Sequence, residues 1–300
     1  MKHIILLTSC VNPNGMPFTA LSDINVRKQQ YLDALRFYVN NTPLPIVYVD
    51  NSNVDIKEYN VISNIVDDRL ELLSFDGNHD KEHGKGYGEL EIIDYAIKHS
   101  NIINSNKNVS IIKITGRLVI VNIMTIINQL KYNILPSSNS VICSMNSDFS
   151  MADSRLLIAP VNFYISLIEK RVNINDLRGV YLEHVLCNLI KRQQFYLYHP
   201  FFTEPQYQGV SGSTNLTYEA KKRTNSEKIR YTVYVISQIF EFPYYVKNHI
   251  NMSYIRKSIL YSLLILLKIF NKFLANMNNE NLQINILFII IENYFIISAI

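Results

Sequence analysis

Four short apolar runs, each ending at polar turn-forming residues, recur through the first 120 residues of this chain. They lie at 4–7, 46–49, 70–75 and 109–114 and are rich in Ile, Val or Leu. A short run of such residues that stops at Thr, Asp, Asn or Gly is typical of a buried β-strand. A similar run at 141–145 predicts a further strand.

Stretches with helical spacing separate these runs. Residues 27–40 place Tyr31, Leu35 and Tyr38 on one face, and residues 89–99 place Ile and Ala residues likewise. Alternating strands and helices predict an α/β fold, an open and mainly parallel sheet with helices on both faces. Because such sheets bind ligands at the carboxyl ends of their strands, the polar residues that follow each run mark the expected site.

Composition limits the class of protein. The chain has 300 residues, 48% of them hydrophobic, with only nine Gly and nine Pro, which excludes collagen-like and disordered chains. A net charge of +4 with no run of Lys and Arg argues against nucleic acid as a partner and suits a small anionic ligand. Three cysteines without C-x-x-C spacing indicate neither a disulfide framework nor a zinc site, so we expect a cytoplasmic protein.

The composition changes after Asn225 to Ile, Leu, Phe, Tyr, Lys and Asn, and all nine glycines precede this point. We therefore expect a catalytic domain over 1–225 and a helical C-terminal appendage over 226–300. The appendage contains two apolar blocks, 258–275 and 282–300, both interrupted by charged or polar residues that a transmembrane helix would not favour. Two interpretations stay open for them, a helix lying on an anionic inner membrane surface and a pair of core-packing helices.

The densest group of glycines surrounds Lys85 immediately before a predicted helix, in the segment GKGYGE that begins at Gly84. Glycines at a helix start leave backbone N–H groups open to an anion at the positive end of the helix dipole. The segment matches neither a Walker A loop nor a G-x-G-x-x-G fingerprint. A flexible surface turn is the alternative interpretation.

A second group, Lys113, Gly116 and Arg117, lies at the end of the run 109–114. Lys113 interrupts an apolar strand, and burying its ammonium is costly unless an anion meets it. A structural salt bridge would satisfy this requirement. The neighbouring Arg117 and Gly116 favour a phosphate-bearing ligand instead.

Three polar groups follow in the second half of the chain. Asp148, Asp153, Ser154 and Arg155 come after the run 141–145. This group suits a metal, sugar hydroxyls, or an Asx-rich turn with a helix cap. Glu183 opens a predicted helix, where it is either a general base or a favourable charge at the helix start. The loop-rich stretch 201–218 suits the covering of a ligand or an acceptor sugar.

Taken in order, these segments resemble bacterial glycosyltransferases of surface-polysaccharide (capsule and O-antigen) gene clusters. The resemblance covers roughly residues 1–220 and rests on IILLTS, VYVDNSN, GKGYGE, KITGR, ADSR and GVYLEH. It implies a GT-A-like domain with a single Rossmann-type sheet. It also implies an enzyme that moves a sugar from a nucleotide-activated donor to a glycan or lipid-linked acceptor, by an inverting displacement.

The resemblance also implies roles for individual residues. Glu183 would deprotonate the acceptor hydroxyl, with His184 beside it as the second catalytic residue. Thr8 and Asp50 would lie near the base or ribose of the donor, and Lys85 and Gly86 near its diphosphate or sugar. The remaining expected donor-binding residues are Lys113, Arg117, Asp153 and Arg155. The expected acceptor-binding residues are Tyr207, Ser211 and Ser213.

The usual metal-binding Asp-x-Asp of this family is replaced here by Thr115-Gly116-Arg117. We therefore expect no metal cofactor, with Lys113 and Arg117 neutralising the leaving diphosphate. The alternative is Mn²⁺ or Mg²⁺ bound by Asp148 or Asp153. Expected partners are the nucleotide-sugar donor, the acceptor and the inner membrane surface through the C-terminal region. Two other classes stay open, a non-catalytic nucleotide-sugar-binding protein and a membrane-associated scaffold that binds anionic head groups.

Overall fold

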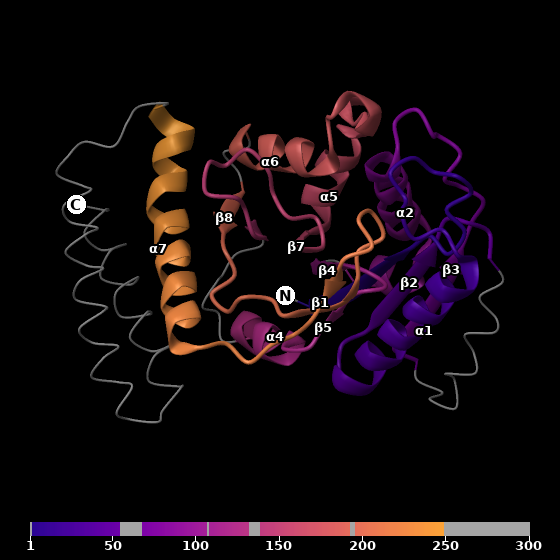
Figure 1. Cartoon of the computed structure of the whole chain (residues 1–300), viewed down its shortest axis with the longest axis horizontal. Helices are drawn as coiled ribbons and strands as arrows, with labels where there is room; N and C mark the ends of the chain where they lie inside the picture. Colours follow the sequence, from indigo (N-terminus) through magenta and orange to yellow (C-terminus); the bar gives the residue numbers. More distant parts are fainter. Residues whose placement is uncertain (1, 55–67, 107, 132–138, 193–195, 249–300) are drawn as a thin grey trace. The chain divides into compact units, whose positions relative to one another are not determined.

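The computed structural model describes residues 2–54, 68–106, 108–131, 139–192 and 196–248 (Figure 1). The chain divides into two compact units, residues 1–222 and residues 223–300. Each unit is described by itself.

The first unit is built on a sheet whose seven described strands are ordered β3-β2-β1-β4-β7-β6-β8. Their bounds are β1 Lys2–Ser9, β2 Ile46–Asp50, β3 Leu70–Ser74, β4 Val109–Thr115, β6 Ser140–Ile142, β7 Leu156–Pro160 and β8 Leu197–His199. Strands β3, β2, β1 and β4 are parallel, and β6 is parallel to β8. Strand β7 runs antiparallel to both β4 and β6. The expected mainly parallel sheet is confirmed, and β7 is a strand that the apolar runs did not reveal.

Helices cover both faces of this sheet (Figure 1). Their bounds are α1 Ile24–Asn41, α2 Lys85–His99, α3 Asn101–Asn104, α4 Ile123–Lys131, α5 Val161–Ile168 and α6 Leu182–Arg192. Apolar residues of α1 and α4 join one face of the strands in a single core cluster. Helices α2 and α5 contact the strands from the other face, and α6 packs on α5. Helix α2 begins at Lys85, four residues before the expected start at Glu89, so the glycine-rich segment forms its first turn.

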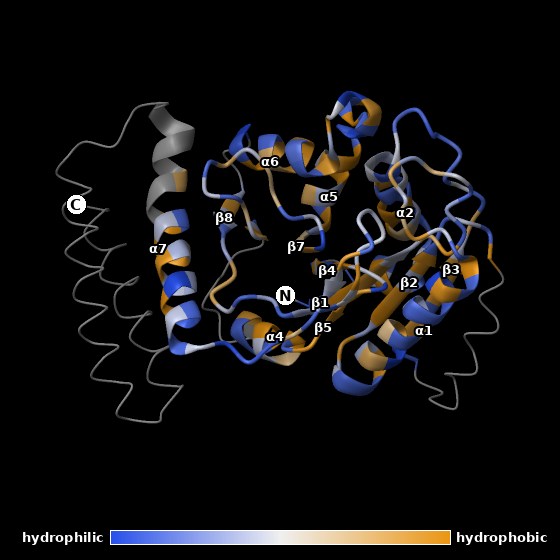
Figure 2. Ribbon diagram, in the orientation of Figure 1, coloured by the Kyte–Doolittle hydropathy of each residue, from blue (hydrophilic) through white to orange (hydrophobic). Residues whose placement is uncertain are grey.

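Successive side chains of a strand point to opposite faces of the sheet, so each strand contributes residues to both faces. Ile5 and Leu7 of β1 belong to the core cluster on the α1 side, whereas Lys113 of β4 belongs to the face covered by α2. Figure 2 shows hydrophobic residues along the strands and both hydrophobic and hydrophilic residues on α1. Within this core, the hydroxyl of Tyr38 donates to the Leu118 carbonyl at 2.8 Å and accepts from the Ile120 amide at 2.9 Å.

A small second sheet carries part of the expected loop-rich stretch. It consists of β5 Val119–Ile120, β9 Tyr207–Val210 and β10 Thr217–Tyr218, in the order β10-β9-β5 with antiparallel pairing. Because β5 follows β4 almost directly, this sheet holds residues 207–218 beside the carboxyl end of β4.

The second unit contains helix α7, Asn225–Asn248, in its described residues. This helix agrees with the helical appendage expected after Asn225. The two apolar blocks at 258–275 and 282–300 lie outside the described residues. None of the helices within the described ranges combines the length and hydrophobicity needed to span a bilayer.

Substitution of Tyr38 by Phe is expected to lower the free energy of unfolding by about 1–3 kcal/mol, because it leaves the buried Leu118 carbonyl and Ile120 amide without their shared partner. Urea unfolding followed by circular dichroism measures the change. Tyr181→Phe, at an exposed tyrosine, is the control and should leave the unfolding midpoint in place. Equal midpoints for the two variants would contradict the importance of the Tyr38 hydrogen bonds.

Candidate functional site

A cavity of about 590 Å³ opens where the carboxyl ends of β1 and β4 meet the first turns of α2 and α6. The register aligns Thr8 of β1 with Thr115 of β4, and both line the cavity. Loops around Phe18 and Gly212 complete the lining. The cavity therefore occupies the position that the strand order of a parallel sheet predicts for a ligand.

Asp50 does not line this cavity, although the family resemblance implies that it lies near the base or ribose of the donor. Its carboxylate is fully buried and accepts hydrogen bonds from the Ser9 hydroxyl at 2.6 Å and the Val11 amide at 2.9 Å. The Ser52 amide, at 2.8 Å, satisfies the other carboxylate oxygen. Asp50 thus holds the turns that follow β1 and β2, and its oxygens are occupied by the chain itself.

The first turn of α2 is already capped by a carboxylate, that of Asp176. Its Oδ2 accepts from the Lys85 amide at 2.8 Å and from the Gly86 amide at 3.3 Å. Gly84 has a φ of 90°, and a Cβ there would lie 2.6 Å from the Asp176 side chain. The family resemblance implies that these amides approach the diphosphate or the sugar of a donor, but an aspartate 91 residues away along the chain fills that place. Burial raises the pKa of Asp176.

Lys85 lines the cavity as expected, and its ammonium contacts neutral oxygens. The Nζ atom donates to the Phe18 carbonyl and to the Ser213 hydroxyl, each at 2.6 Å. Burial lowers the pKa of Lys85. Ser213 and Ser211, both predicted to bind the acceptor, line the cavity as well. Lys85 therefore connects the two loops that complete the cavity lining.

Arg117 has nitrogen atoms that the fold leaves without partners. Its Nε and Nη1 atoms are buried and form no hydrogen bond. The guanidinium lies against Gly212, where a Cβ would come within 2.0 Å of Nη1. Buried donors without an acceptor are rare in native proteins and are costly. Arg117 lines the cavity, so an anionic ligand there would supply the missing acceptors.

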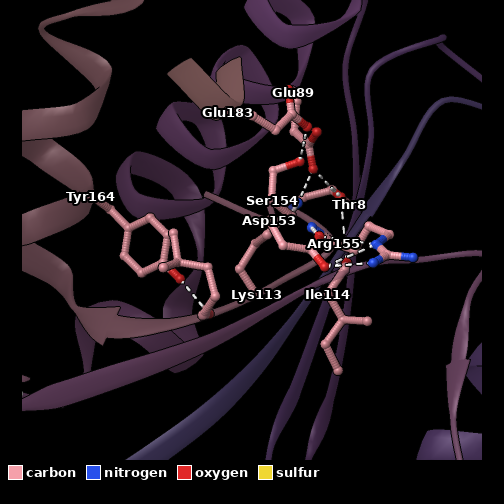
Figure 3. A network of polar contacts seen from close by, with 10 residues as sticks. Thr8, Glu89, Lys113, Ile114, Asp153, Ser154, Arg155, Tyr164 and Glu183 are labelled. Carbon is pink, nitrogen blue, oxygen red and sulfur yellow. Dashed lines mark hydrogen bonds and ion pairs between the residues drawn. The ribbon is translucent and has the colours of Figure 1, made fainter. Parts of the chain in front are cut away.

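Lys113 was expected to contact the diphosphate, but its ammonium is bound by groups of the chain itself. Its side chain is 2% exposed, forms an ion pair with Glu89 of α2 and donates to the Ser154 carbonyl at 2.6 Å. It does not line the cavity, whereas Glu89 does. Thr8 donates to the same Glu89 carboxylate at 3.3 Å (Figure 3). Of the two interpretations of Lys113, the structure shows the salt bridge.

Glu183 lines the cavity from the first turn of α6. Its Oε1 accepts from the Ser154 hydroxyl at 2.6 Å, and Figure 3 shows its carboxylate beside that of Glu89. Burial raises the pKa of Glu183, which suits a group that takes up a proton. His184 does not line the cavity: its Nδ1 accepts from the Tyr181 amide at 3.1 Å and its ring stacks on that tyrosine.

Asp153 and Arg155 line the cavity as a pair. The Arg155 Nε and Nη2 atoms donate to the Asp153 carboxylate at 2.9 Å and 2.6 Å. The guanidinium also lies 4.2 Å from the ring centre of Tyr207 and 5.1 Å from that of Tyr218. Tyr218 lines the cavity, but Tyr207, predicted to bind the acceptor, supports Arg155 without lining it.

The carboxylates considered as metal ligands do not converge. Asp148 is exposed in the tight turn 146–151, and the Ser150 amide bonded to its carboxylate lowers its pKa. Asp153 lies beyond the base of that turn and is paired with Arg155. Within the described ranges, no group of three or more His, Cys, Asp or Glu side chains is placed to hold a metal ion. The expected alternative of Mn²⁺ or Mg²⁺ at Asp148 or Asp153 therefore does not fit this geometry.

Sequence reasoning missed two lining carboxylates, Glu89 and Asp176. Glu89 belongs to the quoted segment GKGYGE, but its pairing with Lys113 depends on how α2 packs on β4. Asp176 reaches the start of α2 from the 3₁₀ turn Asp176–Arg178, which no motif marks. In both cases the missing information is a contact between segments far apart in the chain.

No protein-family model matches the sequence, and no curated protein matches it. Among solved structures, it is similar to a mannosyltransferase from Pyrobaculum calidifontis in complex with GDP-Man and Mn²⁺, at a TM-score of 0.39 and 14% identity over 89% of this chain and 70% of the other. A cytidylyltransferase from Leptospira borgpetersenii serovar Hardjo-bovis has a TM-score of 0.42 and 13% identity, over 84% of this chain and 100% of its own. A putative glucose-1-phosphate thymidylyltransferase from Bacillus anthracis, in complex with a sucrose, has a TM-score of 0.40 and 11% identity, over 70% of this chain and 89% of its own. Similarity of this degree does not bear on the function of the chain.

Substitution of Arg117 by Met is expected to remove anion binding without destabilising the unliganded protein, because two of the replaced nitrogens, Nε and Nη1, are buried there without a partner. We expect the free energy of unfolding to be unchanged or about 1 kcal/mol higher, while the affinity for pyrophosphate falls at least about tenfold. Urea unfolding and isothermal titration calorimetry with pyrophosphate measure the two effects. Arg36→Met, on the exposed face of α1, is the matched control. Unchanged pyrophosphate affinity in Arg117→Met would contradict the assignment.

Proposed function

We propose that this chain is a glycosyltransferase that takes a sugar from a nucleotide-activated donor and transfers it to a glycan or lipid-linked acceptor in bacterial surface-polysaccharide synthesis. The donor lies in the cavity at the carboxyl ends of β1 and β4. The observation that carries the proposal is Arg117, a cavity-lining arginine with two buried nitrogens that have no partner.

The charges around the cavity support a diphosphate as the ligand. Four cationic side chains line it, but Arg155 is paired with Asp153 and Arg27 is bonded to backbone carbonyls. Lys85 and Arg117 form no ion pair with a carboxylate of any described residue. Two cations without carboxylate partners match the two negative charges of the diphosphate in a nucleotide sugar, and they stabilise the nucleoside diphosphate as it leaves.

The approach of a diphosphate requires the loop around Gly212 to move. The Arg117 nitrogens are buried against Gly212, and Lys85 bonds to Ser213 of the same loop. A diphosphate between the two cations would replace the Ser213 hydroxyl at Lys85. Ser211 and Ser213 then lie at the edge of the donor site, where we place the acceptor.

Glu183 is the base in this mechanism. Its carboxylate takes the proton of the acceptor hydroxyl as that oxygen attacks the anomeric carbon of the donor sugar. The bond between the anomeric carbon and the diphosphate oxygen breaks, and the nucleoside diphosphate leaves with its charge held by Arg117 and Lys85. A single displacement of this kind inverts the anomeric configuration, and the proton remains on Glu183 until the product departs.

Glu183→Gln should bind donor as the wild type does and lose transfer by about 10²- to 10⁴-fold, because the amide cannot accept the proton. Calorimetry with the donor and release of nucleoside diphosphate in the presence of acceptor separate the two effects. Glu82→Gln, at an exposed glutamate, serves as the control. Full activity of Glu183→Gln would exclude Glu183 as the base.

Transfer should also increase with pH through a midpoint above 4.5, the ordinary pKa of a glutamate. Burial raises the pKa of Glu183, and the base works only when ionised, so activity is absent below this midpoint and present above it. A pH profile of kcat/KM tests the sign. Activity that falls as pH rises through this range would contradict a carboxylate base.

The donor class is tested by thermal shift against UDP-, GDP-, CMP- and dTDP-sugars, each with Mn²⁺ and with EDTA. One nucleotide class should raise the melting temperature, and Arg117→Met should lose that shift. Binding without any transfer to glycan or lipid-linked acceptors would favour a non-catalytic nucleotide-sugar-binding protein. No shift with any donor, together with binding to anionic vesicles, would favour a scaffold.

A further inference from the structure

Ser154 and the nearby Ala152 hold Glu183 by its side chain and by its backbone. The Ala152 amide donates to the Glu183 carbonyl at 3.1 Å. The Ser154 hydroxyl donates to Oε1 of the Glu183 carboxylate at 2.6 Å. Ser154 is 8% exposed, so water does not readily replace this bond. The start of α6 and the direction of its first carboxylate therefore depend on where Ser154 lies.

Ser154 is in turn held by hydrogen bonds from β4. Its carbonyl accepts from the Lys113 ammonium at 2.6 Å, and the next residue's carbonyl, that of Arg155, accepts from the Thr115 amide at 3.0 Å. Lys113 is itself held by its ion pair with Glu89. Figure 3 shows the resulting line of contacts from Glu89 through Lys113 and Ser154 to Glu183. These contacts join α2, β4, the segment 153–155 and α6.

A hydroxyl at position 154 suits both protonation states of the carboxyl group it contacts. A serine hydroxyl has one donor and two acceptor lone pairs. It donates to the Glu183 carboxylate, and after a rotation it accepts from the carboxylic acid. The contact therefore persists whichever carboxyl oxygen of Glu183 takes up the proton.

Three charged groups face Glu183 besides its serine partner. Glu89 on α2 raises its pKa, whereas Lys113 on β4 lowers it, and Lys85 at the start of α2 also interacts with it. Burial remains the main cause of the raised pKa, and the Ser154 hydrogen bond opposes it. Loss of that hydrogen bond should therefore leave Glu183 harder to ionise.

We propose that Ser154 is a positioning residue for Glu183: the ion pair of Lys113 and Glu89 fixes the Ser154 peptide, and the Ser154 hydroxyl aims the Glu183 carboxylate into the cavity. This proposal rests on the proposed function in naming Glu183 as the base. The contacts themselves belong to the resting protein and are testable without any donor.

The test compares Ser154→Ala with Ser154→Thr, which keeps a hydroxyl. In Ser154→Ala the midpoint of the acidic limb of kcat/KM should rise by about one pH unit, which is about tenfold less activity at a fixed pH on that limb. Ser154→Thr should return the midpoint towards the wild-type value. Ser147→Ala, at an exposed serine of the preceding turn, should change nothing. Equal loss of activity at every pH with an unmoved midpoint would reduce Ser154 to a structural role and overturn the proposal.

A second measurement separates this proposal from the proposed function. Titration of the Glu183 carboxyl by ¹³C NMR, with its signal assigned by its absence in Glu183→Gln, follows the same midpoint without donor or acceptor. The midpoint should be higher in Ser154→Ala than in the wild type, and an unchanged midpoint would overturn the role of Ser154. If Ser154→Ala does not fold, Ser154→Thr and Ser154→Val, which match in shape, make the same comparison. Absence of transfer by the wild type would refute the proposed function alone.

Discussion

The ammonium of Lys113, buried within the sheet, is the constraint on which the site depends. A cation with this little exposure requires a partner, since removal of one member of a buried pair costs about 3–5 kcal/mol. The fold meets the requirement with the Glu89 carboxylate and the Ser154 carbonyl. Helix α2 and the segment 153–155 are thereby fixed against the same strand. The positions of Glu89 and Glu183, which both line the cavity, follow from one buried charge.

A second feature follows from how the remaining charges are distributed. Most of the charged groups that line the cavity already have partners: Asp153 pairs with Arg155, Asp176 caps α2, and Arg27 binds backbone carbonyls. Arg117 is the exception, because its buried nitrogens are left without acceptors. Other charged groups that line the cavity therefore have partners within the chain, whereas Nε and Nη1 of Arg117 have none.

The elements that could be predicted from the sequence are those marked by local pattern. Strands β1 to β4 stand out as apolar runs with polar ends. The helix expected over 27–40 corresponds to α1, and the helix that Glu183 was expected to open corresponds to α6. Strand β7 was missed because its run, Leu156–Pro160, passes directly into α5 at Val161 without a polar turn. The short strands β5, β9 and β10 have two to four residues each and depend on pairing between distant segments.

The same division applies to the candidate site. Thr8, Lys85, Arg117, Arg155 and Glu183 line the cavity, because strand ends and helix starts bring them there. Their roles remain predictions. The sequence could not reveal which charged groups would pair with one another. It left open both a salt bridge and a ligand for Lys113, and it gave no sign that Asp50 would bind only groups of the chain itself.

The most direct test of the account is a crystal structure with a bound nucleoside diphosphate sugar. The account predicts diphosphate oxygens within hydrogen-bond distance of the Arg117 Nε and Nη1 atoms and of the Lys85 ammonium, with the Gly212 loop displaced and the sugar facing Glu183. A diphosphate bound elsewhere, with the Arg117 nitrogens still buried against Gly212 and without partners, would contradict it.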